Sequence, residues 1–395
     1  MDIIDRILQK ESWEEFLEHK KCHGHLERGE EAEWRAFIEA ERFRELPVAG
    51  ELPLPVRKEI NKSGSDKKRV IYSYPEPFNS ILKGIAFQLY RYDDLFEDSC
   101  YAFRRNKSAA DALKRLTQLN GDAKCWCLKA DISNYFNSID TGRLLDSLVF
   151  LRAEDERLFQ LFRELLLKDK VEDAEGNVFV EQHGAMAGIP VAPFFANVYL
   201  SDLDRLFDKE RYFRYSDDLL LLADSEAELY ALRDRLFTAL EEHRLKLNEK
   251  KLHVYAPAEA VEYLGFSVCG KEVDLSDSTK EKLKGKIRRK ARALRRWSEE
   301  KKLPGERGAK GFIRAMNRKL FSAEGKEFSW SRWFFPLLTT DQGLRELDAF
   351  MQQYIRFCVT GRHYKGNYRI RYETLKSWGY RCLVHEWWAG VRGGG

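Results

Sequence analysis

The chain has 395 residues, of which 44% are hydrophobic and 33% are charged, and its formal net charge is +4. This length exceeds one typical domain, and the composition excludes an intrinsically disordered chain. The charge is too close to neutral to indicate a polyanionic partner by itself. The seven cysteines include no CxxC pair, the amino terminus lacks an apolar signal-peptide core, and no uncharged apolar run reaches about 18 residues. We therefore expect a cytoplasmic protein with reduced thiols and no membrane contact.

Residues 1–60 predict a helical amino-terminal extension followed by a linker. Apolar residues such as Trp13 and Phe16 recur at near-helical spacing among charged residues. Prolines then interrupt the chain between residues 47 and 55. This extension by itself says little about function.

Between residues 61 and 275 short apolar strands alternate with helices. CWCLKADI (125–132) predicts a strand that ends near an acidic residue, and FRYSDDLLLLAD (213–224) predicts two strands joined by a tight turn. A helix is expected over residues 225–243. These elements indicate an α+β plan, in which one antiparallel sheet carries acidic residues and helices lie behind it.

Residues 276–395 predict a basic helical region. Ser278 and Glu281 form a capping-box pattern in front of a long helix. Ten basic residues stand against one acidic residue over residues 280–296, and such a helix could bind nucleic acid phosphates without regard to base sequence. A merely solvated charged face is the alternative. The expected buried stripe consists of Leu283, Ile287, Leu294 and Trp297.

Three aspartates lie where a buried carboxylate is costly. Asp131 ends an apolar strand, and Asp217 and Asp218 occupy the turn in front of four leucines. Two carboxylates ~4 Å apart repel by about 4 kcal/mol at an effective dielectric near 20, and bound cations remove that cost. Nucleotidyl transfer needs such a cluster, with two metal ions roughly 3.5–4 Å apart held by hard oxygen ligands that suit magnesium. Alternatively, Asp217 and Asp218 only satisfy the geometry of a turn.

The order of these motifs resembles that of the reverse transcriptases over about residues 65–268. The resemblance implies an α+β right-hand polymerase fold, with fingers and an antiparallel-sheet palm over residues 61–275 and a helical thumb in residues 276–395. The matching segments are KKRVIYSYPEPFNSILKGIAFQLY (67–90), CYAFRRNKSAADAL (100–113), KADISNYFNSID (129–140), GAMAGIPVAPFFANVYLSDLD (184–204), YSDD (215–218), LKLNEKK (245–251) and EYLGF (262–266).

The resemblance also implies roles for the residues of the catalytic centre. Asp131, Asp217 and Asp218, with the backbone carbonyl of Ile132, are expected to bind two Mg²⁺ ions, with Mn²⁺ as an alternative. Lys251 is expected to protonate the leaving pyrophosphate.

Further residues match positions that contact the nucleotide or the nucleic acid. Phe136 matches the position that screens the sugar 2′-hydroxyl, and Lys67 and Arg69 lie where the fingers contact the triphosphate. Many family members carry Gln-Gly where this chain has Ala187 and Gly188, so fidelity or nucleotide preference could differ. Contacts with template or primer are expected for Arg104, Arg105, Tyr215, Gly265, Lys284, Arg288, Arg292 and Arg295.

Within the family, the chain is most similar to bacterial enzymes of the unassigned and defence-associated groups, which are related to those of group II introns and retrons. RYETLKSWGYRCLVHEWW (371–388) is one of the segments that suggest this branch. The resemblance implies an RNA-directed DNA polymerase that uses dNTPs and a structured non-coding RNA template to make a DNA product, in anti-phage defence and with possible partner defence proteins. Two alternatives are template-independent or protein-primed synthesis by the same site, and a catalytically silent RNA-binding scaffold.

Overall fold

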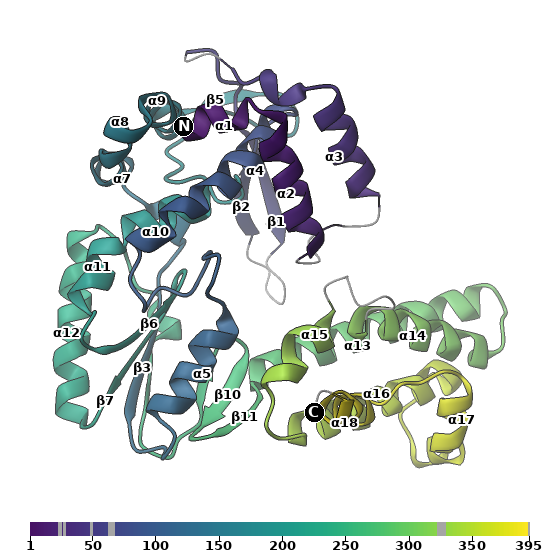
Figure 1. The fold of residues 1–395 in the computed structure, drawn as a ribbon. Helices are drawn as coiled ribbons and strands as arrows, with labels where there is room; N and C mark the ends of the chain where they lie inside the picture. Colours follow the sequence, from purple (N-terminus) through teal and green to yellow (C-terminus); the bar gives the residue numbers. More distant parts are fainter. Residues whose placement is uncertain (23–25, 27–28, 48–49, 62–67, 322–328, 394–395) are drawn as a thin grey trace. The chain divides into compact units, whose positions relative to one another are not determined.

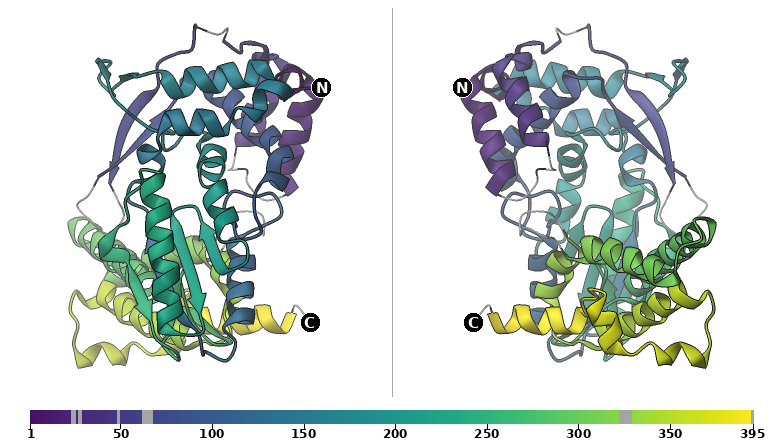
Figure 2. Two further views of the ribbon diagram at one scale, coloured as in Figure 1. Left: turned by 90° about the vertical axis from the view of Figure 1, so that its left-hand side faces the viewer. Right: turned by 90° about the vertical axis from the view of Figure 1, so that its right-hand side faces the viewer.

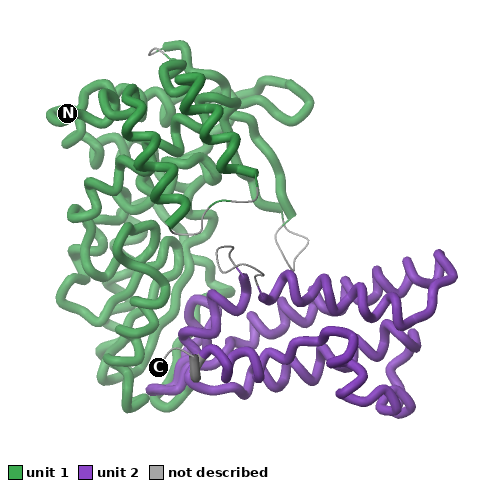
Figure 3. The backbone as a smooth tube through the Cα atoms, turned by 45° about the vertical axis from the view of Figure 1, so that its right-hand side comes forward, with its two compact units in different colours: residues 1–22, 26–259 green, residues 23–25, 260–395 purple. Residues whose placement is uncertain are grey.

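The chain divides into two compact units (Figure 3). The first contains residues 1–22 and 26–259, and the second begins at residue 260. The amino-terminal helices therefore belong to the same unit as the sheets that follow them, and the second unit begins before residue 276. None of the helices in the described residues is long and apolar enough to cross a membrane. The computed structural model describes residues 1–22, 26, 29–47, 50–61, 68–321 and 329–393.

Aromatic side chains hold the amino-terminal helices together. The ring of Trp13 lies 6.1 Å from that of Trp34 and 5.9 Å from that of Phe43. The indole also lies on Gly84 of α4 (Phe78–Gln88), where a Cβ would come within 2.4 Å of the ring. The absence of a side chain at residue 84 therefore permits this packing. The helices of this region are α1 (Ile3–Ile7), α2 (Lys10–Cys22), α3 (Glu30–Glu39) and the 3-10 helix η1 (Arg42–Arg44).

A small sheet in the order β2-β1-β4-β5 follows these helices. Strands β1 and β2 are antiparallel, and β1 meets β4 in parallel at the pair Val56–Glu172. Its strands are β1 (Val56–Asn61), β2 (Lys68–Ser73), β4 (Lys170–Glu172) and β5 (Val178–Val180). The helices nearby in sequence are η2 (Leu89–Leu95), α7 (Thr141–Ser147), α8 (Phe150–Glu154) and α9 (Glu156–Leu167).

A second sheet, the central sheet, has the order β6-β7-β3-β8 and is antiparallel throughout (Figure 1). Residues Leu219–Ala223 of β7 are all buried, which explains why this strand is continuously apolar. Helix α12 packs on β7 and β3, as the left-hand view of Figure 2 shows, and α5 packs on β6. The predicted hairpin and the helix after it are confirmed. The strands are β3 (Trp126–Asp131), β6 (Arg211–Tyr215), β7 (Asp218–Ala223) and β8 (His253–Tyr255), and the helices are α5 (Ala109–Leu119), α6 (Tyr135–Ser138), α10 (Ala192–Tyr199), α11 (Ser201–Leu206), α12 (Glu226–Glu242) and η3 (Glu249–Lys251).

The second unit combines a three-stranded sheet with helices. Its sheet has the order β11-β10-β9, and α13, α14 and α16 pack against one another. The elements are β9 (Val261–Tyr263), β10 (Phe266–Cys269), β11 (Glu272–Leu275), α13 (Asp277–Glu300), α14 (Gly305–Leu320), α15 (Trp330–Phe334), η4 (Phe335–Leu337), α16 (Gln342–Thr360), η5 (Lys365–Arg369), α17 (Tyr372–Ser377) and α18 (Leu383–Gly393).

Two details of α13 differ from the sequence prediction. Ser276, not Ser278, caps the helix, because its hydroxyl accepts a hydrogen bond from the Thr279 amide at 3.2 Å. Trp297 was expected to be buried, but it is 43% exposed. The buried face is set by contacts with α14 and α16, which the periodicity of one helix does not reveal.

Candidate active site

Asp131 and Asp218 lie opposite each other on neighbouring strands of the central sheet. Asp131 ends β3, Asp218 begins β7, and the two residues are paired in register. Asp217 precedes Asp218 in the turn, and its carbonyl accepts a hydrogen bond from the Ile132 amide at 3.0 Å. The structure therefore brings the three predicted carboxylate residues and Ile132 to one edge of the sheet.

The turn that carries Asp217 depends on its first residue, Ser216. Because Tyr215 pairs with Asp218, the loop between β6 and β7 has two residues. Ser216 has a φ of 60°, and two-residue hairpin loops favour positive φ at their first position. A small unbranched residue tolerates that conformation better than a β-branched one. The local sequence therefore fixes where the acidic turn projects from the sheet.

Burial and mutual repulsion favour protonation of the turn carboxylates. Burial, with further contributions from the neighbouring Asp217 and Asp131, raises the pKa of Asp218 to about 6. Burial and the charge of Asp131 also raise the pKa of Asp217. Nearby cations oppose both pKa shifts without cancelling them. The positive charge at this edge of the sheet is therefore too small to neutralise the carboxylates.

Lys251 contacts the third carboxylate. Its ammonium lies on Oδ1 of Asp131, and the side-chain amide of Asn248 donates to Oδ2 at 3.3 Å. The Asn248 backbone amide also donates to the Asp131 carbonyl at 2.8 Å, which fixes the 245–251 segment beside β3. The Lys251 side chain is 46% exposed, against 5% for that of Asp131. Lys251 thus reaches the site from the protein surface, next to the carboxylates as the sequence predicts.

The fit of this cluster to metal ions rests on its chemistry. In the described part of the chain, no three His, Cys, Asp or Glu side chains are already grouped closely enough to hold a metal ion. Asp131, Asp217 and Asp218 nevertheless offer oxygen atoms alone, which hard divalent cations prefer. The raised pKa values of the two turn carboxylates indicate missing positive charge. A cation at Asp131 would compete with Lys251 for the same oxygen.

Asn137 joins three segments beside the carboxylates, and the sequence analysis missed it. Its side chain accepts from the Ala187 amide at 2.9 Å and donates to the Val70 carbonyl at 3.3 Å. The Ala187 carbonyl in turn accepts from the Tyr72 amide at 2.7 Å. A Cβ at Gly188 would lie 2.7 Å from the Tyr72 carbonyl oxygen. The close approach of strand β2 therefore accounts for a glycine at residue 188.

Phe136 lies on the short helix α6, directly after β3. Asn134 starts this helix with a φ of 49°. The Phe136 ring lies 5.7 Å from that of Tyr135 and 6.2 Å from that of Phe103. Its carbonyl accepts from the Ala185 amide at 2.8 Å. These contacts hold the partly buried ring in place, and its role in sugar selection stays a prediction.

Of the two cations predicted to contact the triphosphate, one lies in the described residues. Arg69 is exposed on β2, and its charge lowers the pKa of Asp217. The guanidinium therefore acts electrostatically on the acidic turn. Lys67 lies outside the described residues.

Arg104 and Arg105, both predicted to contact the template, differ in environment. Arg104 forms an ion pair with Asp93 at 2.9 Å, and its side chain is 6% exposed. Its guanidinium also donates to the carbonyls of Glu97 and Cys100 at 3.1 and 3.2 Å. These contacts engage the Arg104 guanidinium within the protein, and its contact with the template stays a prediction. Arg105 is exposed and remains a candidate.

Arg214 and Asp204 form a fully buried ion pair next to the acidic turn. Both side chains are 0% exposed, and Nη2 of Arg214 lies 2.5 Å from Oδ2 of Asp204. Arg214 also donates to the side chains of Asn197 at 3.1 Å and Cys100 at 3.1 Å, and Tyr212 donates to Asp204 at 3.2 Å. A lone arginine in the apolar strand FRYS was the sequence signal for this pair, because a buried guanidinium needs a carboxylate.

Tyr215 and Gly265, predicted to contact nucleic acid, lie in different units. Tyr215 ends β6, and burial raises the pKa of its hydroxyl. Gly265 lies in the β9–β10 turn with a φ of 89°. Its carbonyl accepts from the Thr279 hydroxyl at 2.8 Å and from the Ser276 amide at 3.1 Å. The glycine therefore ties this turn to the start of α13.

Three of the four predicted contact residues on α13 face α16 instead of solvent. Lys284 pairs with Glu346 at 2.5 Å, and its side chain is 14% exposed. The guanidinium of Arg288 lies 5.9 Å from the centre of the Phe350 ring. The third residue, Arg295, pairs with Glu299 at 2.7 Å and donates to the Val359 carbonyl at 2.8 Å.

Lys284 and Arg295 are thus neutralised or engaged within the helical bundle, and their contact with nucleic acid stays a prediction. Arg288 is partly buried, whereas Arg292 is exposed and remains a candidate for phosphate contact. The sequence showed that α13 is basic, but it did not show which of its faces is covered.

An antiparallel sheet that brings a strand-terminal aspartate beside an Asp-Asp hairpin turn defines a polymerase palm. A model of the family "Reverse transcriptase (RNA-dependent DNA polymerase)" matches residues 60–268, more than half of the chain. The chain therefore belongs to the reverse transcriptase family, which implies dependence on a divalent metal, and the predicted α+β polymerase fold is confirmed.

Curated relatives match parts of the chain. Group II intron-encoded protein LtrA of Lactococcus lactis subsp. cremoris is 28% identical over 177 residues, which are 40% of this chain and 27% of that protein. An uncharacterized 91 kDa protein in the cob intron of Schizosaccharomyces pombe is 30% identical over 118 residues, or 30% of this chain and 14% of that protein. The chain thus spans about a quarter or less of the length of these relatives.

Solved structures with a similar arrangement include two telomerases. Telomerase from Candida albicans in complex with a TWJ fragment of telomeric RNA is 13% identical, with a TM-score of 0.46, over 83% of this chain and 63% of that chain. Apo telomerase from Candida tropicalis is 12% identical, with a TM-score of 0.45, over 86% of this chain and 68% of that chain.

Proposed function

We propose that this protein is an RNA-directed DNA polymerase whose catalytic residues are Asp131, Asp217 and Asp218. The observation that carries the proposal is the convergence of these three residues at one edge of the central sheet, with too little positive charge to neutralise them. Membership of the reverse transcriptase family supplies the reaction class.

The carboxylates, with the carbonyl of Ile132, would hold two Mg²⁺ ions, or Mn²⁺ in their place. When bound, two such ions activate the attacking 3′-hydroxyl and stabilise the leaving pyrophosphate. Burial of the turn carboxylates supports this assignment, because a cation offsets the cost of keeping both ionised.

Residues around the carboxylates have separate roles in the proposed reaction. Lys251 carries a proton beside Asp131 and is the candidate acid for the leaving pyrophosphate. Arg69 would neutralise part of the charge on the triphosphate of the incoming dNTP. Phe136, held by Phe103 and Tyr135, would exclude the 2′-hydroxyl of a ribonucleotide.

We further propose that the template is a structured non-coding RNA and that the DNA product serves anti-phage defence, with partner defence proteins. This part rests on the resemblance of the motifs to bacterial defence-associated enzymes.

The experiment is primer extension on a defined RNA template with dNTPs and Mg²⁺, followed by sequencing of the product. The wild type is compared with Asp217→Ala/Asp218→Ala and with Asp224→Ala, which removes an acid that is 79% exposed and lies just beyond β7. We expect complementary DNA from the wild type and from Asp224→Ala, and none from the double variant.

Two results would replace the proposal. DNA that matches no template, or DNA that stays attached to protein after protease digestion, would indicate untemplated or protein-primed synthesis. Equal RNA binding by the wild type and the double variant, without synthesis by either, would indicate a silent scaffold.

A further inference from the structure

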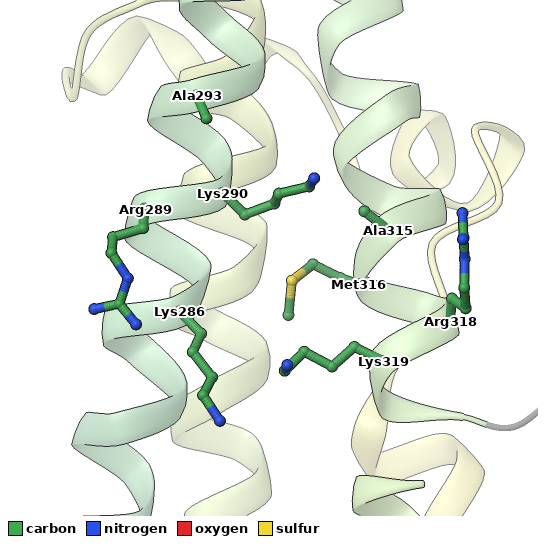
Figure 4. A pocket seen from close by; sticks show the side chains of 8 residues that line it. All are labelled: Lys286, Arg289, Lys290, Ala293, Ala315, Met316, Arg318 and Lys319. Atoms are coloured by element: carbon green, nitrogen blue, oxygen red, sulfur yellow. The ribbon is translucent and has the colours of Figure 1, made fainter. Parts of the chain in front are cut away.

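Cations line a groove between α13 and α14 (Figure 4). Lys286 and Lys290 of α13 and Lys319 of α14 point into it, and the Met316 side chain lies between them. Arg289 and Arg318 stand at its two edges. The groove has a volume of about 680 Å³, so it can hold several polar groups of a ligand at once.

These five cations have no internal counter-charge. No hydrogen bond or ion pair joins their side chains to any other residue in the part of the chain that the structure describes. On the face of α13 toward α16, by contrast, the cations have partners, because Lys284 and Arg295 pair there with glutamates. The groove is thus one part of α13 where positive charge is gathered without an ion-pair partner among the described residues.

The pKa of a lysine in the groove agrees with this absence of counter-charge. Burial, followed by the charges of Lys319, Arg289 and Lys282, lowers the pKa of Lys286. Cations that disfavour one another's charged state bind an anion favourably, because the anion relieves their repulsion. The floor supplies a second kind of contact, since Met316 is buried at 3% exposure and offers an apolar surface.

The shape of the groove restricts the ligand. With a volume of about 680 Å³, the groove can hold a short stretch of one extended strand, and a double helix is too wide to enter it. Cations on both sides and an apolar floor match a strand that has phosphates along its length and apolar sugar and base surfaces between them.

We propose that the groove between α13 and α14 binds the sugar–phosphate backbone of a single-stranded nucleic acid. The choice of a nucleic acid over other polyanions rests on the proposed polymerase function. Binding itself requires neither the catalytic aspartates nor a metal ion, so its test can be separated from the test of synthesis.

The test measures binding of fluorescently labelled oligonucleotides to the full chain carrying Asp217→Ala/Asp218→Ala, in EDTA and over a range of salt concentrations. The probes are one sequence as single-stranded RNA, the same sequence as single-stranded DNA, and an RNA–DNA hybrid duplex. The groove variant is Lys286→Gln/Lys290→Gln/Lys319→Gln.

The matched control is Lys301→Gln/Lys302→Gln/Arg307→Gln. It removes three exposed cations from the opposite end of the same pair of helices. The groove variant should weaken single-strand binding at least roughly tenfold and reduce the log–log salt slope by about 2, because each lost phosphate contact contributes ~0.7. The control should bind like its parent.

The RNA and DNA probes identify the strand. Equal losses for both indicate recognition of the backbone alone, and a larger loss for RNA identifies RNA as the ligand; either result supports the groove. An unchanged salt slope in the groove variant, an equal loss in the control, or an equal loss for the hybrid duplex would overturn the proposal. Absence of synthesis by the wild type in the primer-extension assay, with single-strand binding retained by the parent and weakened in the groove variant, would count against the polymerase proposal alone.

Discussion

The β6–β7 hairpin contributes to two charge clusters that differ in burial and in neutralisation. Arg214 of β6 is held by Asp204 of α11 in a pair whose side chains are both 0% exposed. In the turn that follows, Asp217 and Asp218 are partly buried and have no such ion pair among the described residues, and the pKa of each carboxyl is raised.

This difference separates structural charge from functional charge. A buried ion pair with its hydrogen bonds satisfied holds elements in place, because breaking it leaves an uncompensated charge. Buried carboxylates without a partner weaken the fold, and they persist where a ligand supplies the missing charge. The following experiments test whether the two clusters behave in these opposite ways.

The largest effect should come from the acidic turn. Asp217→Asn or Asp218→Asn should reduce the rate of DNA synthesis by roughly 10³-fold or more, or about 4 kcal/mol of barrier, because a ligand of the metal is lost. Thermal unfolding without metal should show equal or higher stability than wild type. A variant that keeps its activity would refute the catalytic assignment. A large loss of stability would show that these carboxylates stabilise the fold instead of awaiting a ligand.

The buried ion pair of Arg214 and Asp204 should respond in the opposite way, with a loss of stability. Asp204→Ala should lower the free energy of unfolding by about 3–5 kcal/mol, because Arg214 would be left buried and unpaired. Denaturant unfolding measures this change. Asp224→Ala is the control, since Asp224 is a 79% exposed partner of Arg211, and its loss should cost at most about 1 kcal/mol. Similar values for the two variants would show that burial does not distinguish them.

Substitutions of Lys251 test whether this side chain donates a proton or supplies only a positive charge. Lys251→Gln should reduce the rate of synthesis about 100-fold, within the range expected for general acid catalysis. Lys251→Arg keeps the positive charge at Asp131 but does not release a proton near neutral pH, so it should be almost as slow. Wild-type rates in Lys251→Arg, measured by single-turnover incorporation, would leave Lys251 with only an electrostatic role.

The smallest effect should be the response to pH without metal. Folded Asp218 has a pKa of about 6, against an ordinary value of 3.8, so the folded chain binds this proton more tightly than the unfolded chain does. The free energy of unfolding in EDTA should therefore fall by about 1–3 kcal/mol as pH rises from about 4 to about 6. Mg²⁺ should restore part of this loss above pH 6, and Asp218→Asn should reduce the pH-dependent part without abolishing it, because the pKa of Asp217 is also raised. A flat profile for the wild type would contradict the raised pKa.

The sequence predicted the acidic site because its signal is local. Asp131, Asp217 and Asp218 stand next to apolar strands, and the hairpin of β6 and β7 is a local pattern. The pairing of β3 with β7, which sets Asp131 opposite Asp218, is a contact between distant segments that only the structure shows. The position of Lys251 came from the resemblance, and the structure places it in contact with Asp131.

What the sequence could not predict depends on contacts between distant residues. Arg104, Lys284 and Arg295 looked like free cations, and the carboxylates and carbonyls that engage them are supplied by other segments. The pairing of Arg214 with Asp204 has the same cause, because no periodicity joins a strand residue to one on α11. Charge content is visible in a sequence, but charge compensation requires the fold.

The side chain of Asn137 has a mechanical consequence. By bonding to Val70 and Ala187 at once, it fastens strand β2 to the loop that leads into α10 and to the helix of Phe136. Arg69, next to Val70, is thus linked through this one side chain to the helix that carries Phe136. A displacement of the strand that would bind the triphosphate, or of the helix whose aromatic ring would exclude the 2′-hydroxyl, strains the same two hydrogen bonds.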